Sequence, residues 1–220
     1  MPSSRNKGEE NEIFLKAFLL QEMSHKNEVG PFGVIKTLSF GPGQELPKWL
    51  SGYEELLNNR DYSTLKEIVP KAPTSCKADI SINDKAYSLK YAGGARSALV
   101  NHTNRKGFKR VIEKIGADIK PLDKIVNEYW EKRQLGVISE DVKNSDPNSA
   151  FKDSQEYFEP ILKYFLFEGS GSKDSDFKAD LVLEFSSPVD PKTYSIYSPE
   201  DVISSVWNKL VFSLRSKKGM

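Results

Sequence analysis

Apolar residues recur at helical spacing in several stretches of the chain, and these stretches predict its helices. From Glu9 to Met23 the apolar positions follow one helix face. A second pattern runs from Phe108 to Ile115 and stops at Gly116, where glycine suits the left-handed conformation that often ends a helix. Further helices are predicted over Pro121–Arg133, within Trp49–Ile68, and from Pro199 onward with an apolar stripe of Val202, Val206, Trp207, Leu210 and Leu214.

Short β-branched stretches between these helices predict strands. Residues 33–40 (GVIKTLSF) predict one strand, and residues 178–185 (KADLVLEF) with 192–198 (KTYSIYS) predict a hairpin. Pro160 is expected to break or restart the helical pattern around it. Helices and strands alternate without a repeating βα unit, so we predict one mixed α/β domain over residues 1–220, a central mixed β-sheet flanked by helices. We expect residues 1–10 to form a polar, flexible lead and residues 139–150 a flexible loop.

The stretch SCKADISINDKAYSLKYAGG predicts a hairpin that turns at Asn83 and Asp84, which both tolerate the positive φ angles of such turns. Because side chains alternate between faces, one face is apolar and belongs to the core. On the other face Asp79 lies opposite Ser88, with Lys90 one diagonal step away. This face is either the wet side of a half-buried sheet with a cross-strand ion pair, or a site where a carboxylate, a hydroxyl and an ammonium group converge.

Composition indicates a soluble globular protein. The chain has 38% hydrophobic and 29% charged residues, and no apolar run approaches the roughly 18 residues of a membrane span. The single cysteine, Cys76, excludes an intramolecular disulfide, and the first ten residues lack the apolar core of a signal peptide. We therefore expect a cytoplasmic protein without a membrane partner.

Charge is sorted along the chain although the net charge is only +1. Residues 85–114 carry eight basic side chains and one acidic side chain, whereas residues 139–159 are acidic. Solvated helix faces would explain this pattern, but the basic segment also contains donors suited to phosphates and base edges. The candidate DNA-binding residues are Arg96, Asn101, His102, Asn104, Arg105, Lys106, Lys109 and Arg110.

The hairpin with its basic continuation resembles the PD-(D/E)xK nuclease superfamily and is similar to type II restriction endonucleases. In that family an aspartate on one strand precedes an acidic residue, any residue and a lysine on the next. The resemblance makes Asp79 a metal ligand, Lys90 the catalytic lysine and Leu89 a metal ligand through its backbone carbonyl. Ser88 stands where the family usually has a carboxylate, which leaves the second metal ligand open.

Glu12 is the candidate for that second carboxylate. Gly8 and Glu12 match the Gly-x-x-x-Glu pattern often found on the first helix of the same family. The alternative is an exposed glutamate in the first turn of a helix, where a negative charge is favourable.

The resemblance implies a restriction-endonuclease-like core and a Mg²⁺-dependent endonuclease of type II restriction type. Such an enzyme would hydrolyse phosphodiester bonds in double-stranded DNA and act as a homodimer, because two strands are cut symmetrically. The alternative is a nucleic-acid-binding protein without catalysis, in which Ser88 marks a lost active site.

Overall fold

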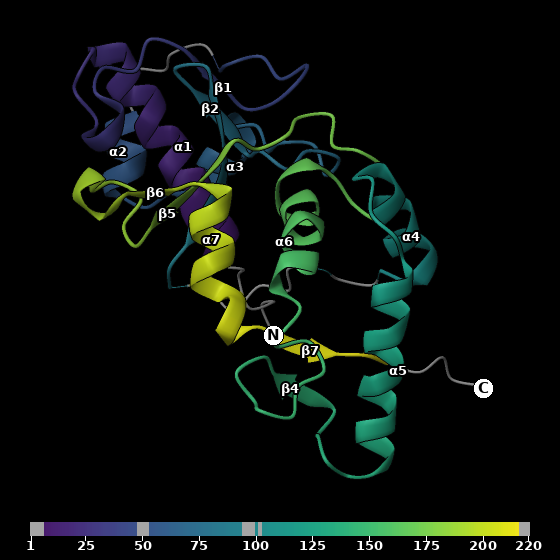
Figure 1. The fold of residues 1–220 in the computed structure, drawn as a ribbon. Coiled ribbons are helices and arrows are strands. Elements are labelled where there is room, and N and C mark those ends of the chain that lie inside the picture. Colours follow the sequence, from purple (N-terminus) through teal and green to yellow (C-terminus); the bar gives the residue numbers. More distant parts are fainter. Residues whose placement is uncertain (1–6, 48–52, 94–99, 101–102, 216–220) are drawn as a thin grey trace. The chain divides into compact units, whose positions relative to one another are not determined.

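The computed structural model describes residues 7–47, 53–93, 100 and 103–215 (Figure 1). The chain combines helices with a five-stranded mixed sheet and a two-stranded sheet, which confirms the predicted mixed α/β class. It separates into two compact units. Unit 1 comprises residues 1–98, 166–169 and 173–199, and unit 2 comprises residues 99–165, 170–172 and 200–220.

Unit 1 contains three α-helices beside its sheet. Helix α1 (Lys7–His25) occupies the predicted first helical stretch, and α2 (Tyr53–Asn58) and α3 (Tyr62–Ile68) occupy the second. Helix α1 packs against α2, α3 and the central strand. Its residues Phe14, Leu15 and Leu19 lie in the same hydrophobic core as the strands. Short 3₁₀ turns at Gly30–Phe32 (η1) and Pro191–Thr193 (η3) complete the helical part of this unit.

The sheet of unit 1 has the strand order β1-β2-β3-β5-β6. Its strands are β1 (Leu38–Ser39), β2 (Ile80–Ile82), β3 (Lys85–Tyr91), β5 (Leu181–Phe185) and β6 (Ser195–Tyr197). Only β3 and β5 run parallel, and the other neighbours are antiparallel. The β5–β6 pair is the predicted second hairpin, whereas the strand predicted over residues 33–40 shortens to β1.

The β2–β3 hairpin has the predicted turn and register. Asn83 and Asp84 have φ angles of 48° and 64°, and Ile82 pairs with Lys85. A two-residue turn with positive φ at both positions matches the right-handed twist of the strands. The side chains of Ile80, Tyr87 and Leu89 are buried in the core, as the alternation predicts.

Strand β3 is held on both sides by an aspartate that directly precedes a neighbouring strand. Oδ2 of Asp79, before β2, accepts the Leu89 backbone N–H at 2.8 Å. Oδ2 of Asp180, before β5, accepts the Ala86 backbone N–H at 2.9 Å. The backbone N–H of Asp79 in turn donates to the Tyr87 carbonyl. A buried backbone N–H group needs an acceptor, and the two carboxylates accept the N–H groups of β3 that strand pairing leaves without one.

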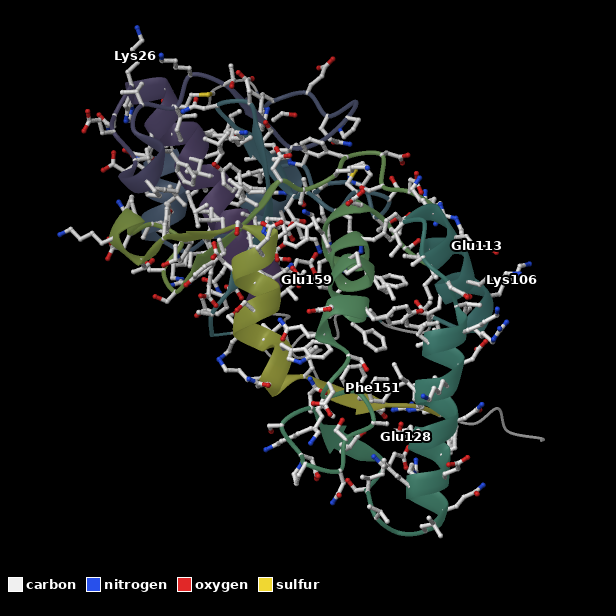
Figure 2. The ribbon with its side chains drawn as sticks, in the orientation of Figure 1. Lys26, Lys106, Glu113, Glu128, Phe151 and Glu159 are labelled. Carbon is white, nitrogen blue, oxygen red and sulfur yellow. The ribbon has the colours of Figure 1, made fainter. Side chains whose placement is uncertain are left out.

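Unit 2 contains α4 (Arg105–Lys114), α5 (Lys120–Gln134), α6 (Gln155–Lys163) and nearly all of α7 (Pro199–Val206). A short antiparallel sheet pairs β4 (Asp141–Lys143) with β7 (Val211–Ser213). Phe151, labelled in Figure 2, stacks on Phe212 at a ring-centroid distance of 3.7 Å. The turns η2 (Tyr164–Glu168, a π-helix) and η4 (Trp207–Lys209, a 3₁₀-helix) follow α6 and α7.

Three sequence predictions for unit 2 need correction. Helix α6 continues through Pro160, because Phe158 and Ile161 are buried on either side and their packing offsets one lost backbone hydrogen bond. The last helix ends at Val206 instead of continuing to Leu214, because residues 211–213 pair with β4. The segment 139–150, predicted as a loop, contains β4 with Val142 buried.

No helix among the described residues is long and apolar enough to cross a membrane.

The hairpin turn gives the first testable prediction. Asp84→Gly is expected to stabilise the protein by about 0.5 kcal/mol, because glycine adopts positive φ without strain. Asn83→Gly is expected to destabilise it by about 1 kcal/mol, since Asn83 Oδ1 accepts the Lys36 N–H at 2.8 Å and its Nδ2 donates to the Val34 carbonyl. Urea unfolding measures the free energy of unfolding of both variants. If both variants are stabilised, or both destabilised, the different roles assigned to Asn83 and Asp84 in the turn are wrong.

Candidate functional site

Asp79 lies at the beginning of β2 and uses its two carboxylate oxygens differently. Oδ2 accepts the Leu89 N–H at 2.8 Å and the Ser88 hydroxyl at 3.5 Å. No hydrogen bond to Oδ1 is found in the part of the chain that the structure describes. One oxygen therefore holds β3 in place, and the other is available to a ligand.

Glu12 on α1 belongs to the same site. Burial and the carboxylate of Asp79 raise the pKa of Glu12 to about 7, while the ammonium groups of Lys90, Lys16 and Lys71 oppose this rise. These charges act on Glu12 only because the folded chain brings α1 close to the hairpin. Glu12 is half-buried rather than exposed, so the alternative of a solvated first-turn glutamate does not describe it.

The predicted hairpin residues differ in their exposure. Ser88 is buried, with 6% of its surface exposed, and Lys90 at the end of β3 is exposed. The Leu89 side chain is buried in the core, and its N–H points toward Asp79. Because the N–H and C=O of one strand residue point to the same edge, the Leu89 carbonyl also faces the Asp79 side of β3.

Sequence reasoning missed three lysines of this region. Lys16 on α1 is 4% exposed, and burial lowers its pKa while Asp79 and Glu12 act in the opposite direction. Burial followed by the charge of Lys90 lowers the pKa of Lys77. Lys71 forms an ion pair with Glu9 at 3.0 Å. Lys16 had a signal in the sequence, because it is the one charged residue in the apolar run IFLKAFLL.

The acid–lysine cluster, defined as Glu12, Lys16, Asp79 and Lys90, contains two carboxylates of the kind that Mg²⁺ prefers. Neither Glu12 nor Asp79 Oδ1 accepts a hydrogen bond from the described residues. Within the described ranges no three His, Cys, Asp or Glu side chains gather as a metal-binding group. The two carboxylates of Glu12 and Asp79 are therefore the candidate oxygen ligands of this cluster.

The described candidates for DNA binding belong to unit 2, and most of them make internal contacts. The Asn104 side chain caps α4 by accepting the Gly107 N–H, and Arg105 forms a bidentate pair with Asp123 at 2.6–2.7 Å. Arg110 donates to the Tyr164 hydroxyl and the Ser170 carbonyl. These contacts stabilise the fold of unit 2 and leave fewer donors for DNA than the sequence suggested.

Two other candidates lie on the exposed surface of α4. Lys109 pairs with Glu113 at 3.5 Å, and Lys106 projects from the helix into solvent (Figure 2). The remaining candidates, Arg96, Asn101 and His102, lie outside the described residues.

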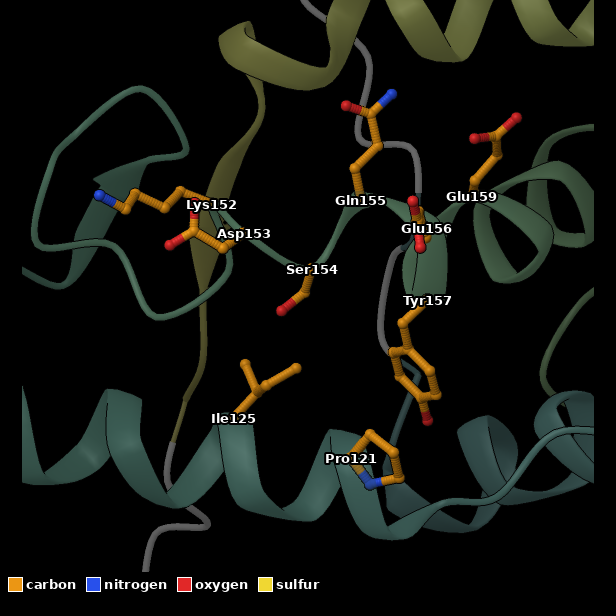
Figure 3. A pocket seen from close by; sticks show the side chains of 9 residues that line it. All are labelled: Pro121, Ile125, Lys152, Asp153, Ser154, Gln155, Glu156, Tyr157 and Glu159. Carbon is orange, nitrogen blue, oxygen red and sulfur yellow. The ribbon is translucent and has the colours of Figure 1, made fainter.

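A hollow of about 640 Å³ in unit 2 lies between α5 and the beginning of α6 (Figure 3). Pro121, Ile125 and Tyr157 line it together with Asp153 and Glu156. The Tyr157 hydroxyl donates to the Asp118 carbonyl. The charged residues that line the hollow are mostly acidic, and such a surface does not suit the phosphate backbone of a nucleic acid.

Comparison of the chain with known protein families, with curated proteins and with solved structures finds no match.

The pKa of Glu12 predicts how stability changes with pH. A carboxyl group with a folded pKa above its unfolded value stabilises the fold fully below the unfolded pKa, and this contribution is lost as pH rises through the folded pKa. A rise from 4.5 to about 7 corresponds to about 3 kcal/mol lost between pH 4.5 and pH 8. In EDTA, Glu12→Gln is therefore expected to gain stability over the wild type at pH 8 but not at pH 4.5.

Urea unfolding at both pH values measures this difference. Glu54→Gln, at an exposed glutamate of α2, is the matched control and should follow the wild type. If the free energies of unfolding of the wild type and Glu12→Gln differ by the same amount at both pH values, the raised pKa of the Glu12 carboxyl group is wrong.

Proposed function

We propose that this protein is a Mg²⁺-dependent endonuclease that hydrolyses phosphodiester bonds of double-stranded DNA. One observation carries the proposal: α1 packs against β3, so that Glu12, far from the hairpin in the sequence, lies close enough to Asp79 and Lys90 for their charges to act on its pKa. Two carboxylates and a lysine are the side chains that the motif of the resembled family uses, which supports the proposal. A half-buried carboxyl group beside a second carboxylate is unfavourable for the fold alone, which favours a functional role.

Glu12 and Asp79 are the residues that would hold the cation, with the Leu89 carbonyl as a further oxygen ligand on the same strand edge. When bound, Mg²⁺ would supply the positive charge that polarises the phosphodiester and makes water a stronger nucleophile. Ionisation of Glu12 accompanies cation binding, since a ligand carboxyl group must be deprotonated.

Lys90 and Ser88 have separate roles in this proposal. Lys90 is exposed at the end of β3, where its ammonium group orients the attacking water or neutralises charge on the phosphate. Ser88 donates a hydrogen bond to Asp79 and is buried, so it orients this carboxylate instead of replacing the missing acidic residue.

Cutting both strands symmetrically requires two such sites, so a homodimer belongs to the proposal. A cytoplasmic location also stays a prediction.

Cleavage of plasmid DNA tests the proposal. The wild type is expected to produce fragments in Mg²⁺ and none in EDTA. Asp79→Asn removes one charge but keeps an oxygen acceptor for the Leu89 N–H, and we expect it to reduce the cleavage rate at least 100-fold without unfolding the protein. Lys90→Ala is expected to lose cleavage to a similar extent while still binding DNA.

Lys85→Ala is the matched control, because Lys85 is also an exposed lysine of β3 but lies at the hairpin turn. It should cut at the wild-type rate. If no divalent metal supports cutting but a salt-sensitive gel shift persists, the protein is a nucleic-acid-binding module without catalysis. Equal cleavage by Asp79→Asn and wild type would place the chemistry elsewhere.

A further inference from the structure

Lys16 is a buried lysine without a direct partner. Only 4% of its surface is exposed, and among the described residues its ammonium group makes no hydrogen bond and no ion pair. The ammonium lies 5.3 Å from the centroid of the Phe40 ring, a contact that positions the side chain but does not neutralise its charge. A buried charge without a partner is costly for the fold, so its retention needs another reason.

Lys16 lies next to the carboxylates of the proposed site. It follows Glu12 by one helical turn on α1, so the two side chains share a helix face. Both Asp79 and Glu12 act electrostatically on the ammonium group, and Asp79 acts more strongly. Neither carboxylate reaches ion-pair distance from the ammonium group, so neither neutralises its charge directly.

The balance of charge changes when a cation binds. In the metal-free cluster the Glu12 carboxyl group is partly protonated near neutral pH, so the ammonium groups of Lys16 and Lys90 face the carboxylate of Asp79 and a partly ionised Glu12. A bound divalent cation would neutralise both carboxylates and leave the two lysines without a counter-charge. The cluster would then attract an anion, and the desolvated ammonium of Lys16 would interact with that anion more strongly than an exposed lysine can.

We propose that Lys16 is a second phosphate-binding lysine of the site, which contacts a phosphodiester oxygen of the DNA backbone from α1 while Lys90 acts from β3. This inference rests on the proposed function, whose substrate it contacts. It assigns Lys16 to binding of the phosphate group and leaves the orientation of water to Lys90.

Binding of a fluorescent DNA duplex, measured by anisotropy over a range of salt concentrations, tests the role of Lys16. Lys16→Met removes the charge but keeps a long apolar side chain in the buried position. In Ca²⁺ this variant is expected to bind about tenfold more weakly, with a salt slope smaller by about one unit, as for the loss of one phosphate contact. The loss of affinity should be smaller in EDTA, where the carboxylates repel the phosphate.

Two further variants make the test specific. Lys16→Arg retains the charge and should bind nearly as the wild type does. Lys26→Met, at the exposed lysine just after α1 (Figure 2), should leave affinity and salt slope unchanged. Near-ultraviolet circular dichroism checks that each variant is folded, and a gel checks that the duplex stays intact.

The outcomes separate this inference from the proposed function. Wild-type affinity and slope for Lys16→Met, or no binding of duplex by the wild type, would overturn the role of Lys16. If Lys16→Met has a smaller salt slope but the wild type cuts no DNA in Mg²⁺, Lys16 remains a phosphate contact and the proposed hydrolysis is wrong.

Discussion

The arrangement of unit 1 depends on how the backbone donors of β3 are satisfied. Asp79 and Asp180 each start a strand beside β3, and each accepts one of its N–H groups through Oδ2. The tripeptide Lys-Ala-Asp precedes both neighbouring strands. The two aspartates therefore fix where β2 and β5 begin relative to β3. In the case of Asp79 the same contact uses only one carboxylate oxygen, and the other accepts no hydrogen bond from the described residues, so that fold and candidate site share one side chain.

The hairpin could be predicted because its information is local. Alternation assigns Ile80 and Leu89 to the core, and Asn83-Asp84 selects a two-residue turn. Once the turn is fixed, the register predicts that Asp79, Ser88 and Lys90 lie near one another on the hairpin. The fold class and the positions of α4 and α5 also follow from periodicity, because each of these helices buries an apolar stripe. Helix α1 follows instead from its apolar content, since its residues from Ile13 to Ala17 are all buried.

The remaining features depend on contacts between distant segments. No local pattern shows that Glu12 approaches Asp79, and the lysine of the run IFLKAFLL looks like a polar interruption until α1 packs against β3. Basic residues of α4 suggested a DNA surface, but Arg105 and Arg110 contact unit 2 itself. The final strand β7 overrides a helical pattern because it pairs with β4. Tertiary context decides each of these cases over local propensity.

The chain order has a consequence for how the protein emerges during synthesis. Strand β3 pairs with β5 across the sheet, but residues 99–165 of unit 2 lie between them in the sequence. The β2–β3 hairpin can close early through local contacts, whereas the other edge of β3 has no partner until residues 181–185 have been translated. In that interval the nascent chain presents an unpaired strand edge, and the inserted residues 99–165 act as a spacer whose compaction shortens the loop to be closed.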